Sequence, residues 1–146
     1  MFNNIVVGAD DSATARRAVA AAAELASLSG GELHIVSAFS SATFSARAFA
    51  QAAGTSEFAY LSTESTVDAL LQSLSFIASE HGLNPTLHGV KSAPAEAIIE
   101  TAEKVDADLV VVGNLGMKGM RRVLGSVPNT VAHGAPCSVL IVDTSE

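Results

Sequence analysis

Cysteine, long apolar runs and positive charge are scarce in this sequence, and each shortage excludes a class of protein. The single cysteine, Cys137, rules out an internal disulfide framework and a zinc site built from several cysteines. No window contains the ~18 consecutive apolar residues that a membrane span needs, although 49% of the residues are hydrophobic. The first residues also lack the basic and apolar segments of a secretory signal. We therefore expect a cytoplasmic protein with no membrane association.

The charge balance argues against a nucleic-acid partner. Fifteen acidic and eight basic residues give a net charge of −7, whereas a broad nucleic-acid-binding surface is usually basic. Three of the basic residues, Lys118, Arg121 and Arg122, nevertheless fall within five positions and form the only basic cluster in the sequence. Such a cluster suits a small anion better than a polymer.

Short aliphatic runs alternate with segments of helical periodicity along the chain. The predicted strands are residues 4–9, 32–39, 84–90, 108–113 and 137–142, and the predicted helices are residues 13–29, 61–81, 94–105 and 126–133. Unbroken aliphatic runs are typical of strands that are buried on both faces. The β-α-β-α-β-α-β-α-β order therefore predicts an α/β fold with a single open five-stranded parallel sheet and helices on both faces.

One long connection interrupts this alternation. Residues 40–59 are mostly small and polar, and five of the seven aromatic residues lie between Phe39 and Tyr60. Phe44, Phe49 and Phe58 could fold over a nucleotide or a partner, or they could form a small satellite cluster under the loop.

The carboxyl ends of two predicted strands carry the candidate site, because ligands of open α/β sheets bind there. The first is the Gly-Ala-Asp-Asp-Ser loop at residues 8–12. Its aspartates could hold Mg²⁺ together with substrate phosphates, or one could be solvated while Asp11 or Ser12 caps the following helix. The second is the glycine-rich segment 113–128.

The glycine-rich segment has the features of a polyphosphate-binding loop. Gly113, Gly116, Gly119 and Gly125 allow positive φ and a close approach of the backbone to a ligand. Gly125 and Ser126 open a helix whose free N–H groups and dipole favour an anion, and the Ser126 hydroxyl can donate to a phosphate. A plain glycine-rich turn before a capped helix would fit the same residues. The segment matches neither the P-loop nor the G-x-G-x-x-G pattern.

These residues resemble the universal stress protein family across essentially the whole chain. The order Gly113, Gly116, Gly125-Ser126 is similar to the G-x2-G-x9-G-[S/T] fingerprint of its ATP-binding branch, with eight residues in place of nine in the long gap. Asp10 matches the aspartate that follows the family's first strand, and residues 127–142 resemble its last helix and strand. The family often has glycine at the position of Ser92.

The resemblance implies a single universal stress protein domain over residues 1–146, with a Rossmann-like fold of the adenine nucleotide alpha hydrolase-like type. It implies a site for ATP or another adenine nucleotide. The residues themselves leave open that Asp10 holds Mg²⁺ bound to that nucleotide. The phosphates would lie against Gly113, Gly116, Gly125, Ser126 and Val127. The ribose and the adenine would lie against Ala9, Asp10 and Ser37. The last strand, residues 137–142, would join two copies into a homodimer.

Three functional hypotheses follow. The first is a nucleotide-dependent regulator in the stress response, with at most slow ATP hydrolysis because no general base is evident beside the phosphates. The alternative is a dimeric interaction module that has lost nucleotide binding. An enzyme of the adenine-nucleotide hydrolase type ranks last, because the S-G-G-x-D-S loop of such enzymes is absent after the first strand.

Overall fold

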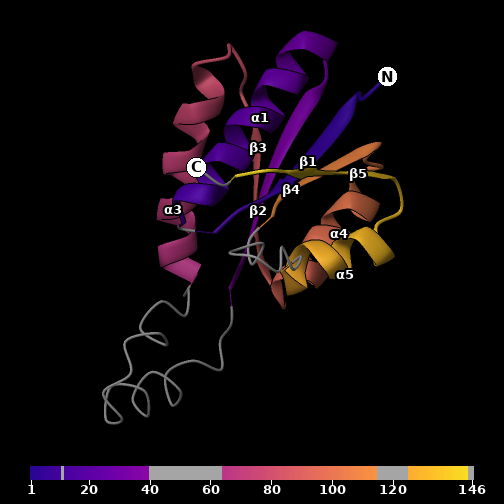
Figure 1. The fold of residues 1–146 in the computed structure, drawn as a ribbon. Helices are drawn as coiled ribbons and strands as arrows, with labels where there is room; N and C mark the ends of the chain where they lie inside the picture. Colours follow the sequence, from indigo (N-terminus) through magenta and orange to yellow (C-terminus); the bar gives the residue numbers. More distant parts are fainter. Residues whose placement is uncertain (11, 40–63, 115–124, 145–146) are drawn as a thin grey trace.

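The computed structural model describes residues 1–10, 12–39, 64–114 and 125–144 (Figure 1). The described elements are β1 (Asn4–Gly8), α1 (Ala13–Ser29), β2 (Glu32–Phe39), α3 (Glu64–Ser79), β3 (Thr86–Lys91), α4 (Pro94–Lys104), β4 (Leu109–Gly113), α5 (Ser126–Gly134) and β5 (Ser138–Val142). Each predicted element is present, and its ends agree with the sequence-based limits to within a few residues. The predicted connection at residues 40–59 and the basic cluster around Arg121 lie outside the described residues.

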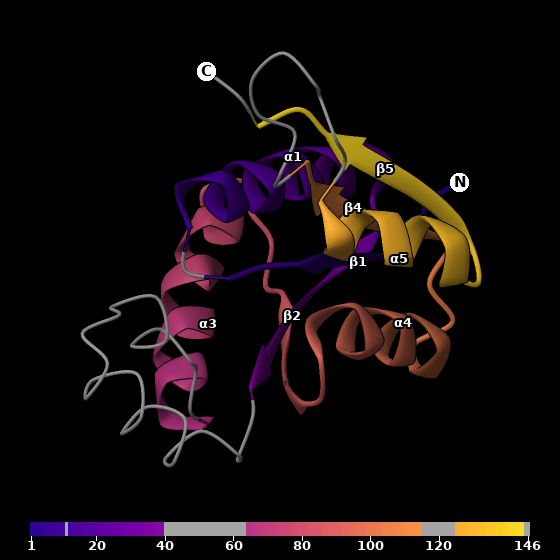
Figure 2. The ribbon, with the colours of Figure 1, turned by 60° about the horizontal axis from the view of Figure 1, so that its bottom comes forward.

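The strands form one parallel sheet in the order β3-β2-β1-β4-β5, which confirms the predicted fold class. The chain builds outward from β1 to β2 and β3, then returns to place β4 on the other side of β1 (Figure 2). The strand order therefore reverses between β1 and β4. In open α/β sheets this is the point where a crevice forms beyond the carboxyl ends of the strands.

Alternate residues of the central strands enter two separate cores. Ile5 and Val7 of β1 pack with α1 and α3 on one face, whereas Val6 packs with α4 and α5 on the other. All three side chains are fully buried. Burial of each such side chain contributes roughly 1.5–3 kcal/mol, which explains why these strands are aliphatic without interruption. None of the described helices has the length and apolar character needed to cross a membrane.

The ends of α1 follow the chemistry expected of helix caps. The Ser12 hydroxyl accepts the N–H of Ala15 at 3.0 Å, so Ser12 caps the helix, and Asp11 lies outside the described residues. Asp10 supports this turn, because its Oδ1 accepts the Ser12 N–H at 2.9 Å. Gly30 ends the helix with a left-handed φ of 71°, the conformation that glycine typically adopts after the last helical residue.

A glycine after the predicted helix at residues 126–133 would be expected to end it in the left-handed conformation, but Gly134 does not do so. It is the last residue of the helix, and the following cap, Ala135, has an extended conformation. A Cβ on Gly134 would lie 2.8 Å from Cδ1 of Ile99 in α4. The glycine is therefore needed because the two helices pack closely, and not because the chain must turn into the left-handed region.

Two histidines form a pair on the α4 side of the sheet, near the amino ends of β2 and β3 and away from the carboxyl edge. Nδ1 of His34 in β2 and Nε2 of His88 in β3 lie 3.0 Å apart, which one N–H donor and one acceptor can satisfy. Burial lowers the pKa of His34, although Glu32 acts in the opposite direction. Burial also lowers the pKa of His88, assisted by His34 and by Lys104 of α4. The pair is therefore held neutral in the folded chain.

We expect the free energy of unfolding to fall as the pH drops below about 6.5, the ordinary pKa of histidine. The unfolded chain binds protons there more readily than the folded chain, so the stability present above that pH is progressively lost. Urea unfolding between pH 8 and 5 measures the effect, and His88→Gln should flatten the profile. His133→Gln, at the exposed end of α5, is the control. An equally steep profile in His88→Gln would contradict the assignment.

Candidate functional site

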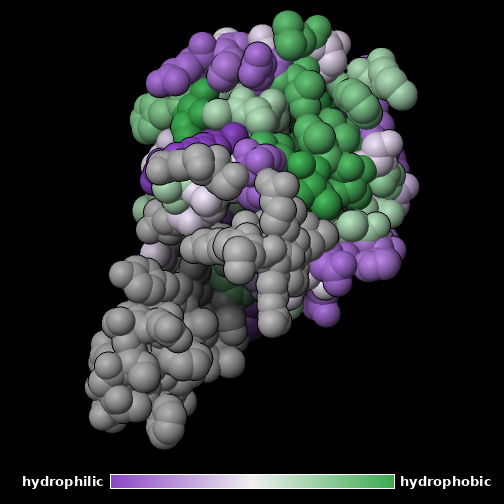
Figure 3. All heavy atoms as spheres, viewed as in Figure 1, coloured by the Kyte–Doolittle hydropathy of each residue, from purple (hydrophilic) through white to green (hydrophobic). Residues whose placement is uncertain are grey.

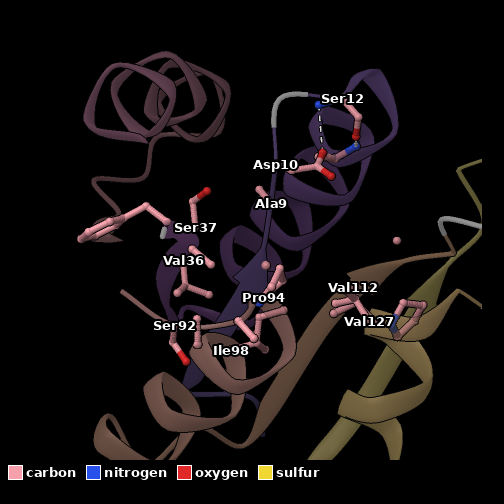
Figure 4. Close-up of a pocket in the computed structure, with 18 of the residues that line it drawn as sticks. Ala9, Asp10, Ser12, Val36, Ser37, Ser92, Pro94, Ile98, Val112 and Val127 are labelled. Atoms are coloured by element: carbon pink, nitrogen blue, oxygen red, sulfur yellow. Dashed lines mark hydrogen bonds between the residues drawn. The ribbon is translucent and has the colours of Figure 1, made fainter. Parts of the chain in front are cut away.

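A pocket of about 580 Å³ opens at the carboxyl edge of the sheet, where the strand order reverses (Figure 4). The ends of β1, β2, β3 and β4 and the first turns of α1, α4 and α5 contribute its lining. Val36, Ile98 and Val112 give it an apolar wall. Its size and largely apolar lining are typical of a small-molecule site.

The end of β1 passes directly against α4 at the bottom of this pocket. A Cβ on Gly8 would lie 2.3 Å from Cδ1 and 2.7 Å from Cγ1 of Ile98, so no side chain fits there without moving that helix residue. The next residue, Ala9, donates its N–H to the Val36 carbonyl at 3.0 Å and ties β1 to β2. The chain is thus fixed where it enters the pocket.

Five of the residues selected from the sequence line this one pocket: Ala9, Asp10, Ser37, Gly113 and Val127. They come from the ends of three strands and from the start of α5. Gly125 and Ser126 precede Val127 directly, as the cap and the first residue of α5, but they do not line the pocket. Gly116 lies outside the described residues.

Ser37 places a hydroxyl group in the otherwise apolar β2 side of the pocket. Only 4% of the residue is exposed, and among the described residues the hydroxyl has no hydrogen-bond partner. Among the described residues, the buried side-chain atom left without a partner is Nε2 of His34 and not the Ser37 Oγ. The Ser37 hydroxyl therefore keeps access to the pocket, where it is available to hydrogen-bond with a ligand.

Three helices begin at the pocket, and they differ in how their first N–H groups are satisfied. Ser12 caps α1, whereas α4 and α5 have no side-chain cap. In α5 the first helical bond runs from the Asn129 N–H to the Gly125 carbonyl, and the intervening Pro128 has no N–H. The N–H groups of Ser126 and Val127 are therefore available at the positive end of the helix dipole.

The glycines of this site act differently from the sequence-based expectation. Only Gly30 and Gly82 have positive φ among the described glycines, and Gly125 has an ordinary φ of −59°. Gly113 is the last residue of β4, and a Cβ there would lie 3.4 Å from Cγ2 of Thr144. Neither a left-handed backbone nor a steric clash therefore requires glycine at position 113.

Sequence analysis missed Lys91, which is the only cationic residue in the described lining of the pocket. It ends β3, and a systematic search of every strand's carboxyl end would have found it. Its neighbour Ser92 also lines the pocket, at the position where glycine was expected. The Ser92 hydroxyl donates to Oε2 of Glu96 at 3.2 Å, and Figure 4 shows it turned toward α4.

Cysteine nucleophile chemistry and a dedicated metal centre find no support in the described residues. Cys137 packs against the core beneath α4 and α5, and burial, with a smaller effect of Asp108, raises the pKa of its thiol. A raised pKa keeps a thiol protonated and unreactive. No group of three or more potential metal ligands occurs in the described part of the chain.

Comparison with known proteins gives consistent results. The sequence profile described as the universal stress protein family matches residues 1–143. A universal stress protein of Mycobacterium tuberculosis is 32% identical over 145 residues, covering 99% of this chain and 98% of that protein. The crystal structure of a universal stress protein in complex with cAMP is 33% identical with a TM-score of 0.75, over 99% of this chain and 98% of that chain. The universal stress protein from Archaeoglobus fulgidus in complex with dAMP has the same fold, with a TM-score of 0.67 at 21% identity over 98% of both chains.

Proposed function

Because the chain belongs to the universal stress protein family, we propose that it binds ATP or a related adenine nucleotide in the pocket between β1 and β4. The start of α5 is the observation that supports this most, since the N–H groups of Ser126 and Val127 are unpartnered among the described residues and Val127 lines the apolar pocket. The phosphates of a nucleotide would bind these N–H groups, and its flat base would occupy the apolar pocket. The relative in complex with cAMP, 33% identical to this chain, supports the same class of ligand.

The arrangement gives the nucleotide a direction. The phosphates would lie on the α5 side, against Gly113, Gly125, Ser126 and Val127, with Gly116 added from the sequence fingerprint. The adenine would lie on the β2 side, where the Ser37 hydroxyl is available to its polar edge. Ala9 and Asp10, between these two ends, would contact the ribose, and the exposed Asp10 carboxylate would help to hold Mg²⁺ bound to the phosphates.

Occupancy of the pocket, rather than turnover, would be the working event of this protein. Asp10 is the only carboxylate in the described lining; its Oδ1 accepts the Ser12 N–H, and its other oxygen is the one available to the proposed Mg²⁺. A general base needs a free acceptor within reach of the attacking water. We therefore expect at most slow ATP hydrolysis, and a cytoplasmic, nucleotide-dependent regulator of the stress response.

Calorimetric titration of the purified chain with ATP, AMP and cyclic AMP, with and without Mg²⁺, tests the proposal. We expect at least one of these to bind with a Kd well below 1 mM, which means a binding free energy more favourable than about −4 kcal/mol. Inorganic triphosphate and GTP are the controls for charge and for the base. Absence of adenine-nucleotide binding would leave the interaction module as the better account.

The free edge of β5 supports a second, compatible proposal, a homodimer formed through residues 137–142. β5 lies at the end of the sheet, and its Leu140 is 38% exposed. Figure 3 shows hydrophobic residues gathered across the face that β5 crosses. An unprotected aliphatic edge is suited to pairing with its own copy about a two-fold axis.

We expect Leu140→Lys to convert the dimer to a monomer, because a charge on an edge strand opposes edge-to-edge pairing. Sedimentation equilibrium over a range of concentrations measures the change. Leu28→Lys is the matched control, since Leu28 is 79% exposed at the far end of α1. Equal association of both variants and the wild type would place the interface elsewhere.

A further inference from the structure

A buried polar cluster connects the end of β4 to the chain that follows β5. Oδ1 of Asn114 accepts the Thr144 N–H at 3.0 Å and the Thr144 hydroxyl at 2.7 Å. Nδ2 of the same amide donates to Oδ1 of Asp143 at 3.0 Å. Asn114 is 7% exposed and Thr144 is 1% exposed, so these bonds are formed largely away from water. β4 and β5 already pair as far as Gly113 and Val142, and the cluster adds side-chain hydrogen bonds beyond that pair. We call Asn114, Asp143 and Thr144 the Thr144 cluster.

The Thr144 cluster is connected to the pocket through Gly113, which contacts Thr144 and lines the pocket. A Cβ on Gly113 would be in ordinary van der Waals contact with the Thr144 methyl group, at 3.4 Å, so the two residues are direct neighbours. Gly113 therefore has Thr144 on one side and the pocket on the other. The main chain at the end of β4 is held in place by the Asn114 bonds and by this contact together.

The helix α1 also forms a hydrogen bond with Thr144. Nη1 of Arg17 in α1 donates to the Thr144 carbonyl at 2.5 Å. The first turn of α1 also contributes Thr14 and Ala15 to the pocket lining. Thr144 is thus bonded to two elements, α1 and the end of β4, that each supply part of the pocket wall.

We propose that Thr144, with Asn114 and Arg17, is a positioning residue for nucleotide binding: it holds Gly113 at the distance from α5 that the phosphates require. The inference rests on the proposed function, since it assigns an indirect role in the same site. Thr144 itself is absent from the pocket lining, so its effect has to pass through Gly113. Sequence analysis gave no reason to single it out, because it lies beyond the last predicted strand.

Thr144→Val tests the proposal, because valine keeps the shape and removes only the hydroxyl. We expect the Kd for ATP to rise by up to about tenfold, because bringing Gly113 back into place on binding would then cost free energy of the order of one buried hydrogen bond. The Kd for adenosine should stay nearly constant, because it has no phosphate to position. Thr144→Ser, which keeps the hydroxyl, should bind ATP nearly as tightly as the wild type.

Thr101→Val is the matched control. Thr101 is a buried threonine, 3% exposed, and its hydroxyl donates to the Ala97 carbonyl at 2.8 Å within α4. Both valine variants should lose similar thermal stability without ligand, whereas only Thr144→Val should lose ATP affinity. Should Thr144→Val not fold, Arg17→Gln removes the bond to the Thr144 carbonyl from the surface, and the same loss is expected.

The outcomes separate this inference from the proposed function. If the wild-type chain binds no adenine nucleotide, the proposed function is wrong and the positioning role falls with it. If the wild type binds ATP and folded Thr144→Val binds it equally well, only the positioning role is overturned. An equal loss of ATP affinity in Thr101→Val would also overturn it, because general destabilisation would then explain the result.

Discussion

Replacement of Ser126 by proline is expected to weaken ATP binding about 100-fold while α5 remains folded. Proline is favoured at the first position of a helix, and the preceding Gly125 has φ −59° and ψ 161°, which a following proline permits. The substitution removes one N–H and one hydroxyl from the predicted phosphate contacts. Each hydrogen bond to a charged group contributes about 1.5–3 kcal/mol, so their loss together has a large effect.

Two further variants isolate the cause. Ser126→Ala removes only the hydroxyl and should weaken binding about tenfold, the effect of one such hydrogen bond at the lower end of this range. Ala13→Pro places the same residue at the first position of α1, after Ser12 with an extended ψ of 156°, and should leave the affinity nearly unchanged. Isothermal titration with ATP measures all three. A wild-type affinity in folded Ser126→Pro would remove the start of α5 from the nucleotide site.

Gly8→Val should lower the free energy of unfolding by about 3 kcal/mol, the upper end for overpacking in a core. The reason is the contact with Ile98, whose Cδ1 and Cγ1 lie 2.3 and 2.7 Å from the position of a Cβ on Gly8. Ile98 is only 5% exposed, so the displaced side chain has little room to move. Urea unfolding monitored by circular dichroism measures the loss.

Gly113 provides the matched comparison for this prediction. It ends β4 as Gly8 ends the neighbouring β1, but a Cβ on it would be in ordinary contact at 3.4 Å. Gly113→Ala should therefore change the stability little. Combining Gly8→Val with Ile98→Ala should recover at least about 1 kcal/mol relative to the sum of the two single effects, because the valine fills the space that isoleucine leaves. Additive effects would mean that the two positions do not compete for space.

The sequence predicted the elements of this fold well because their physical causes are local. Aliphatic runs such as residues 5–7 mark strands buried on both faces, and Gly30 marks a helix end through its own backbone conformation. The half-buried pattern of β3 is equally visible as a weaker strand signal, and β3 proves to be an edge strand. Strand order is different, because the pairing of Val6 with Val110 joins residues far apart in the chain.

The candidate site was predictable as a set of strand ends but not in its details. The topology brings Asp10, Ser37 and Val127 to one pocket because Asp10 follows β1, Ser37 lies near the end of β2, and Val127 is in the first turn of the helix after β4. Lys91 could have been selected as the last residue of β3, but its place in the pocket depends on β3 lying beside β2. The steric reasons for Gly8 and Gly134 lie in contacts with α4, and only the packed structure supplies them.

β5 has an outer side and an inner end with different neighbours. Its outer side is the proposed interface between two copies. The carbonyl of its last residue, Val142, accepts the Asn114 N–H, next to the Thr144 cluster. One strand therefore connects the proposed dimer interface with the proposed nucleotide site. Binding equilibria that share an element are reciprocal: whatever factor dimerisation contributes to ATP affinity, ATP must contribute to the affinity of one copy for the other. The association state of this protein would then report the cell's adenine nucleotide concentration without any phosphate bond being broken.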